Sequence, residues 1–292
     1  MLHRKALCVG INQYQYFPAV RLQGCVNDAL EMTALLKDLL GFADSDITLL
    51  TDQAATKANI MRALKGMVDD ALAGRINHIV FTFAGHGTQV PDLSPDEFDR
   101  ADEAYCPYDL APLGSRWDRD RLLVDDELHD LLVQLPSSVL LELFLDTCHS
   151  GHGLGAADLL LDRRPRYLPP PSIPAYRELE LRRARPAHQK LLEKGLSHHI
   201  LWTACKESQI AAEACFQGDW HGAFTWHFCR EARGSGNHLS RAKVLAKVRL
   251  DLRDKCFTQT PQLDCEAFTR HESLKALRLP PELVPLPAEM PT

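Results

Sequence analysis

Two apolar runs, each ending abruptly at small and reactive residues, constrain this chain most. The first spans Ile79 to Gly87 (IVFTFAGHG) and the second Leu140 to Gly151 (LLELFLDTCHSG). Such a run, stopping at polar residues, is typical of a fully buried parallel strand that meets its loop. The runs deliver His86 and Cys148 at their ends. Because sites in open α/β sheets form at the carboxyl ends of strands, we predict that this imidazole and thiol meet as a cysteine nucleophile and its base.

Alternating strand and helix patterns surround the two runs. Helical spacing of apolar residues is clearest over 57–72, and Gly41 stands where the C-terminal cap of another helix belongs. Strands and helices that alternate in this way form a mostly parallel sheet with right-handed crossovers and helices on both faces. The sequence therefore predicts the α/β class, with further strands at 5–10, 47–50 and 200–204 and helices at 26–40, 57–72, 127–133, 222–232 and 239–252.

Composition narrows the class of protein further. The chain has 292 residues, of which 45% are hydrophobic and 25% charged, which is enough for one substantial core. Its net charge of −6 disfavours nucleic-acid binding, and no stretch reaches the roughly 18 apolar residues of a membrane span. The start, MLHRKALCVGIN, lacks the pattern of a signal peptide, so we expect a cytoplasmic location. Nine cysteines, several in apolar contexts, predict free thiols.

Several motifs in a fixed order carry a family resemblance. GHG after one apolar strand and DTCHSG after a later one resemble the catalytic motifs of caspase-like cysteine peptidases, and most closely those of metacaspases. The resemblance implies a caspase-like three-layer sandwich, a Cys-His endopeptidase and a monomer. We therefore predict a peptidase domain over 1–278, with a large-subunit-like part (1–158), an Arg/Pro-rich connection (159–198) and a small-subunit-like part (199–278), followed by a Pro-rich tail over 279–292. Further blocks that resemble the family are Lys5–Tyr14, Leu22–Ala29, Asp46–Asp52, Ala55–Leu64, Val124–Leu132, His199–Ala214 and Trp220–Thr225.

The residue types at the two strand ends indicate acyl transfer. A thiol of ordinary pKa is mostly protonated at pH 7, so Cys148 needs an imidazole that takes its proton and later protonates the leaving amine. His86 is the candidate. The backbone N–H groups of Gly87 and Cys148 could hold the oxyanion of a tetrahedral intermediate. No third catalytic residue is evident, and the alternative is a core histidine and an inert buried thiol.

Two carboxylates predict the specificity. By resemblance, Asp28 and Asp146 match acidic positions of the family's primary pocket, Cys25 matches a further pocket position, and Ala84 stands where some relatives carry Ser. An Asp in such a pocket selects cations, because a buried carboxylate without a partner is costly. Protein or peptide substrates should therefore carry Arg or Lys before the scissile bond. The alternative for Asp28 is stabilisation of a helix start.

The sequence contains candidate residues for a calcium site but does not decide whether they bind the ion. By resemblance, Asp102, Asp125 and Asp126 match positions with which calcium-dependent metacaspases hold the ion, and hard cations prefer such oxygen ligands. The chemistry itself requires no cofactor, so calcium would be an activator. Against this site, Asp125 and Asp126 also suit the start of a helix. In addition, the family's fourth acidic position is Gly155 here. The other carboxylates between residues 92 and 103 are expected to form a solvated loop.

The Arg/Pro-rich connection raises a further possibility. Its prolines exclude a continuous helix or central strand, so it should be an exposed link. An Arg-rich segment beside an Arg-selective enzyme suggests self-cleavage, and the alternative is a basic segment that is never cut. For the whole chain, the alternative to a peptidase is a catalytically idle caspase-like module that acts in protein interaction or signalling.

Overall fold

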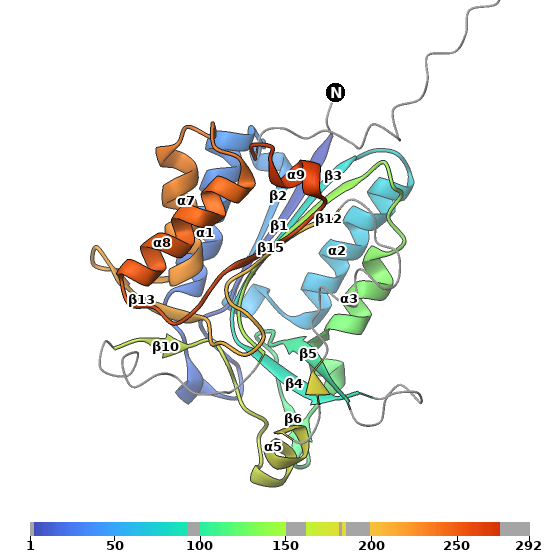
Figure 1. Ribbon diagram of the computed structural model, residues 1–292. Helices are drawn as coiled ribbons and strands as arrows, with labels where there is room; N and C mark the ends of the chain where they lie inside the picture. The colour runs from blue at the N-terminus through green and yellow to red at the C-terminus, as the bar shows by residue number, and fades with distance from the viewer. Residues whose placement is uncertain (1–2, 93–99, 150–161, 181–182, 185–198, 275–292) are drawn as a thin grey trace, which may run out of the picture.

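A central sheet of six strands organises the part of the chain that the structure describes. This computed structural model describes residues 3–92, 100–149, 162–180, 183–184 and 199–274. The strand order is β15-β12-β9-β3-β1-β2, and only β15, at one edge, runs antiparallel to its neighbour (Figure 1). The prediction of a mostly parallel sheet is confirmed. The strands are β1 (Arg4–Gly10), β2 (Ile47–Thr51), β3 (His78–Ala84), β9 (Leu140–Asp146), β12 (His199–Thr203) and β15 (Gln262–Asp264).

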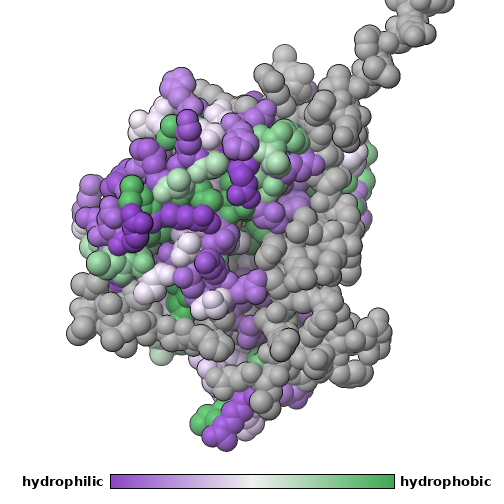
Figure 2. Space-filling view, in the orientation of Figure 1, coloured by the Kyte–Doolittle hydropathy of each residue, from purple (hydrophilic) through white to green (hydrophobic). Residues whose placement is uncertain are grey.

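Helices cover both faces of this sheet, as predicted. One face carries α1 (Cys25–Leu40), α7 (Ala223–Gly234) and α8 (Arg241–Asp254), and the other carries α2 (Lys57–Leu72) and α3 (Asp125–Leu132) (Figure 1). Side chains alternate along each strand, so the sheet separates two hydrophobic clusters. In β1, Leu7 joins the cluster beneath α2, whereas Cys8 joins the cluster beneath α1 and α7. Figure 2 shows that the outward surface around α8 is largely hydrophilic.

The helix boundaries follow from local residue chemistry. Gly41 adopts a left-handed φ of 70° and donates its N–H to Lys37 O, which closes α1 as predicted. Thr56 caps α2 by accepting the N–H of Asn59, and α2 has the predicted bounds. The helix predicted at 127–133 begins two residues earlier, at Asp125.

Smaller sheets lie at the carboxyl end of the central one, and they correct one prediction. The segment after His86 forms a hairpin of β4 (Gly87–Pro91) and β5 (Arg100–Tyr105). Because this hairpin packs against the start of α3, the acidic side chains of Asp92, Asp102 and Glu103 are buried. A solvated loop, which was expected for Asp92 and Glu103, is therefore wrong for these two residues. The other three carboxylates of that stretch lie outside the described residues.

Short elements complete the described chain. β8 (Leu123–Val124) and β11 (Arg183–Ala184) each pair with β5. β10 (Arg164–Pro165) joins β13 (Ala212–Phe216) and β14 (Asp219–Gly222) in a third sheet. All nine cysteines are described, and all are free thiols as predicted. Among the described residues, no helix combines the length and apolar character needed to cross a membrane. The remaining elements are η1 (Pro18–Val20), η2 (Asp44–Asp46), η3 (Asp52–Ala54), β6 (Pro112–Leu113), β7 (Arg116–Trp117), η4 (Arg119–Arg121), α5 (Ile173–Glu180) and α9 (Ala267–Arg270).

Candidate active site

Strand register brings the two predicted reactive residues to the same edge of the sheet. β3 and β9 pair in parallel with Ala84 opposite Asp146, and His86 and Cys148 each follow that pair by two residues. Neighbouring strands lie about 4.8 Å apart, so both residues leave the sheet side by side. Both are buried, with 4% and 2% of their surfaces exposed.

Backbone and aromatic groups fix the orientation of His86. Its Nε2 donates to the carbonyl oxygen of Val20 over 2.8 Å. Its backbone N–H donates to the hydroxyl of Tyr14, whose ring centroid lies 5.2 Å from the imidazole. Nδ1 makes no hydrogen bond of good geometry among the described residues, although the backbone of Arg166, like that of Val20, acts to raise the pKa of the imidazole. With Nε2 as donor, Nδ1 is the unprotonated nitrogen and therefore the one that can accept a proton.

Burial keeps both reactive groups neutral in this state. It lowers the pKa of His86 to about 4, against the opposing effect of the hydrogen bond to Val20. It also raises the pKa of the Cys148 thiol to about 12. At neutral pH the pair is therefore a thiol and an imidazole rather than an ion pair, and the proton has to move as the sulfur attacks.

The chain's own connecting segment runs through this site. The carbonyl oxygen of Arg166 accepts the backbone N–H of Gly87 over 2.9 Å and that of Cys148 over 3.4 Å. These are the two donors predicted to hold an oxyanion. On either side, the N–H of Arg166 donates to Ala211 O, and the N–H of Leu168 donates to Gly87 O. The segment is thus held by its backbone, with the Arg166 carbonyl at the two N–H groups.

The guanidinium of Arg166 is fully buried among three carboxylates. Nη2 lies 2.5 Å from Asp28 Oδ2 and 3.7 Å from Glu213 Oε2, and Nη1 lies 3.1 Å from Asp146 Oδ1. The structure therefore brings Asp28 and Asp146 together around a cation, and it adds Glu213, which the sequence reasoning missed. Burial raises the pKa of Asp146 and of Glu213, and the positive charge of Arg166 opposes this in both cases.

Further groups fix the pocket carboxylates in place. The N–H of Gly222 donates to both oxygens of Asp28 at 3.0 Å, and the hydroxyl of Thr225 donates to Asp146 Oδ2 at 2.7 Å. Asp28 does lie in the first turn of α1, as the helix-start alternative expected, but its side chain points to Arg166. Gly222 leaves no room for a side chain, because a Cβ there would meet Asp146 and the Arg166 guanidinium.

The remaining predicted pocket residues form an apolar wall. Cys25 and Ala84 pack together with Leu22 in a small buried cluster. Burial raises the pKa of the Cys25 thiol, and the positive charge of Arg166 opposes this. Sequence signals for the missed residues did exist, because Glu213 lies in the 199–214 block and Gly222 in the 220–225 block that resemble the family.

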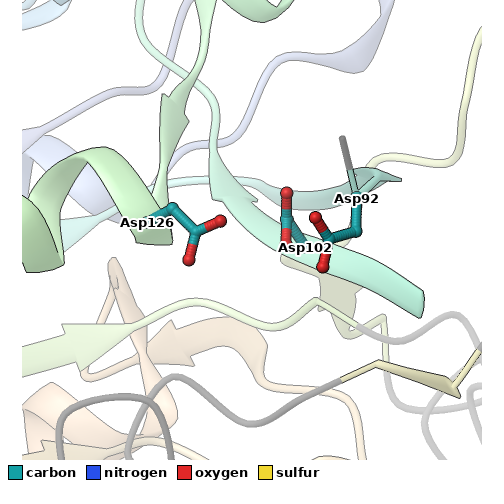
Figure 3. A group of neighbouring side chains, drawn as sticks. All are labelled: Asp92, Asp102 and Asp126. Carbon is teal, nitrogen blue, oxygen red and sulfur yellow. The ribbon is translucent and has the colours of Figure 1, made fainter. Parts of the chain in front are cut away.

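A second acidic group lies on the β4–β5 hairpin. Side-chain oxygens of Asp92, Asp102 and Asp126 lie within 4.8 Å of one another (Figure 3). The group contains two of the three predicted calcium residues, Asp102 and Asp126, and has Asp92 in place of Asp125. The Oδ1 of Asp125 instead accepts the N–H of Asp126. Arg119 donates to Asp102 over 2.9 Å. A carboxylate set of this kind suits a hard cation such as calcium. Gly155 lies outside the described residues.

Known proteins that are similar in sequence to this chain include several metacaspases. A family model described as metacaspase, peptidase C14 domain, matches residues 4–157. Metacaspase-1A of Aspergillus clavatus is 32% identical over 90% of this chain and 66% of its own length. Metacaspase-1 of Coccidioides immitis is 30% identical over 90% of this chain and 61% of its own length. The chain thus spans less than two thirds of these two relatives.

Solved structures share the fold. A protein of Geobacter sulfurreducens superimposes with a TM-score of 0.66 at 24% identity, covering 94% of this chain and 98% of that one. Caspase-1 of Spodoptera frugiperda superimposes with a TM-score of 0.55 at 11% identity, covering 90% and 86% of the two chains. At these identities the likeness concerns the fold alone, and it confirms the predicted caspase-like architecture.

Proposed function

Because this chain belongs to the metacaspase family of caspase-like cysteine peptidases, we propose that it hydrolyses peptide bonds that follow Arg or Lys, through Cys148 and His86. One observation carries the proposal. Arg166 lies with its guanidinium between Asp28 and Asp146 and its carbonyl oxygen on the N–H groups of Gly87 and Cys148. This is the arrangement that a bound substrate requires, with the cation in the pocket and the carbonyl at the oxyanion donors.

The residues of the site support a two-step acyl transfer. The Cys148 sulfur attacks the carbonyl carbon, its proton passes to Nδ1 of His86, and the oxyanion is held by the two N–H groups. The protonated imidazole then gives its proton to the leaving amine, and the C–N bond breaks to leave a thioester. Water, deprotonated by His86, cleaves the thioester and restores the thiol. The Val20 carbonyl would stabilise the imidazolium that forms in between.

Specificity follows from the cost of burying charge. Three carboxylates in a buried pocket are strongly destabilised unless a cation pairs with them. An acidic side chain would add a fourth negative charge, whereas Arg forms a bidentate pair and Lys a point-charge pair. We therefore expect cleavage after Arg or Lys and none after Asp.

The same site supports self-processing within the connection. The bond that follows Arg166 joins it to Tyr167, which pairs with Gly87. Among the described residues, Arg166 is the arginine that occupies the pocket, so the Arg166–Tyr167 bond is our candidate for self-cleavage. Mass spectrometry of the purified chain, beside Cys148→Ala, tests this directly. A cut elsewhere in the connection would refute the assignment.

We extend the proposal to calcium as an activator held by Asp92, Asp102 and Asp126. The ion would offset the charge of three buried or half-buried carboxylates and tie the β4–β5 hairpin to the start of α3. Because β4 begins at Gly87, ordering of this hairpin would bear on an oxyanion donor. A monomeric state and a cytoplasmic location stay predictions.

Hydrolysis of fluorogenic peptides that end in Arg, Lys or Asp, with calcium or chelator, tests the proposed function. Cleavage after Arg or Lys that disappears in Cys148→Ala is the expected result, and cleavage after Asp alone would refute the pocket. The competing function is an idle interaction module. Covalent labelling of Cys148 by an arginyl electrophile would exclude that module, and an unlabelled Cys148 together with silent peptides would favour it.

A further inference from the structure

The loop that follows α8 holds the side chain of a second arginine of the connecting segment. Arg163 Nη1 donates to the carbonyl oxygen of Cys256 over 2.7 Å, and Nη2 donates to that of Lys255 over 2.6 Å. Its Cζ lies 3.6 Å from the centre of the Phe257 ring. Only 7% of Arg163 is exposed.

Three separate features make this loop favourable for a guanidinium. The carbonyl oxygens of Lys255 and Cys256 directly follow the C-terminus of α8, at the negative end of the helix dipole, and both accept from the cation. Cys256 has a left-handed φ of 59° and thereby ends α8. Phe257 presents its ring face to the cation and stacks on Phe216, with ring centroids 6.0 Å apart. The binding site for the Arg163 guanidinium is thus formed by the loop Lys255–Phe257 that follows α8.

The pairing of β10 with β13 fixes the position of this loop relative to the active site. β10 pairs antiparallel with β13, with Arg164 opposite Glu213, so the segment adds a strand to the edge of that sheet. A peptide with its Arg in the pocket and the same pairing to β13 would bring the residue three positions upstream to the α8 loop. We propose that the Lys255–Phe257 loop is a binding site for an arginine at the fourth position before the scissile bond.

This inference rests on the proposed function and makes its substrate class narrower. The substrates are proteins or peptides with an Arg-x-x-Arg sequence, cut after the second Arg. Two carbonyl acceptors and an aromatic face suit the planar guanidinium better than an ammonium group, so the expected order is Arg, then Lys, then Ala. Arg164, at the third position, lies farther from its aromatic neighbour, 4.8 Å from the centre of the Trp220 ring, so that position should discriminate less.

Kinetics with two peptides test the proposal on the full chain. Acetyl-Arg-Arg-Pro-Arg and acetyl-Ala-Arg-Pro-Arg, each with a fluorogenic amide, differ only at the fourth position. We expect kcat/KM to be about tenfold higher for the first, as befits charge-assisted hydrogen bonds and a cation–π contact. Phe257→Leu should reduce this ratio, whereas Phe268→Leu, on the exposed side of α9, should keep it. Equal cleavage of both peptides by the wild-type chain would overturn the inference and leave the proposed function intact.

A second measurement does not depend on activity, so it can refute the contact between Arg163 and the α8 loop even if no peptide is cleaved. In Cys148→Ala, hydrogen exchange reports how often the segment leaves the site. If the loop binds the Arg163 guanidinium, Arg163→Gln should speed exchange of the Arg166 and Leu168 amides about tenfold, and Arg163→Lys should have a smaller effect. Unchanged exchange in both variants would overturn the inference. If Arg163 only anchored the connecting segment, Arg163→Gln would change the exchange rate of these amides, but kcat/KM would be equal for the two peptides. That combination would overturn the inference.

Discussion

Removal of the Arg166 guanidinium should expose the electrostatic cost of the pocket. Arg166→Gln, made in Cys148→Ala so that the chain stays uncut, leaves Asp28, Asp146 and Glu213 buried without their cation. Breaking a buried ion pair by removing one partner typically costs about 3–5 kcal/mol. We expect a loss of unfolding free energy in that range at pH 7, and about 0.5 kcal/mol or less for Arg177→Gln, whose side chain is exposed on α5.

The loss should depend on pH with a definite sign. Burial already raises the pKa of Asp146 and Glu213 in the presence of Arg166, and without the cation both should rise further. A folded-state pKa above the unfolded value gives stability that is full at low pH and is lost as pH rises toward the folded pKa. Each carboxyl that stays protonated from pH 5 to pH 7 adds about 2.7 kcal/mol to the loss. The variant should therefore approach its parent at pH 5.

Urea denaturation followed by tryptophan fluorescence measures these differences, and a small ligand provides a matched rescue. Agmatine carries a guanidinium on a short chain and should refill the vacated pocket. At a concentration of 100 times its Kd, it should restore about 2.7 kcal/mol to Arg166→Gln and nothing to the parent, whose pocket is filled. A loss no larger than that of Arg177→Gln, independent of pH and of agmatine, would refute the reasoning.

Three further predictions concern the pocket wall, acid stability and calcium. Gly222→Ala places a Cβ against Asp146 and should lower kcat/KM for arginyl peptides at least about tenfold, whereas Gly234→Ala, with open space around it, should not; equal kinetics would contradict this. Burial lowers the pKa of His78 to about 3, so proton uptake on unfolding should cost about 2 kcal/mol between pH 7.5 and pH 5. Urea denaturation should show that His78→Phe removes this loss, and an unchanged pH profile would speak against it. Asp126→Asn should weaken calcium binding in isothermal titration about tenfold or more, and the exposed Asp120→Asn should not; matching affinities would argue against the site.

Local patterns in the sequence were enough to predict the frame of the molecule. Periodicity gave α2 its bounds, and the two apolar runs became β3 and β9, because a strand buried on both faces is apolar throughout. Since neighbouring parallel strands in register end together, His86 and Cys148 followed from the same runs. The family resemblance added Asp28 and Asp146, which periodicity alone does not distinguish from a helix-start residue and a strand-end residue.

Contacts between segments that are distant along the chain could not be predicted from the sequence. The Val20 carbonyl that receives His86 Nε2 has no side-chain signature, because every residue has a carbonyl. The prolines near Arg166 excluded a helix there, but the exposed link that they led us to expect is wrong for Arg163 and Arg166, which are buried. Nothing in the composition indicates that Arg166 would fill a pocket built from α1, β9 and β13. The pairing of β4 with β5 brings Asp92 close to Asp102. No periodic pattern in the sequence signals that pairing, so the sequence did not indicate Asp92 as a member of the acidic group.

The position of Arg166 also limits what self-cleavage alone can achieve. Cutting the Arg166–Tyr167 bond would leave Arg166 as a new C-terminus, with its guanidinium still paired to Asp28 and Asp146. Its neighbours would hold it there, since β10 stays paired with β13 and Arg163 stays bound at the α8 loop. A product tethered in this way acts at a high effective concentration and competes with any other substrate. Activity toward other proteins therefore requires the 163–166 segment to leave as well as the bond to break, and weakening of the Arg163 contacts should make the cut enzyme more active.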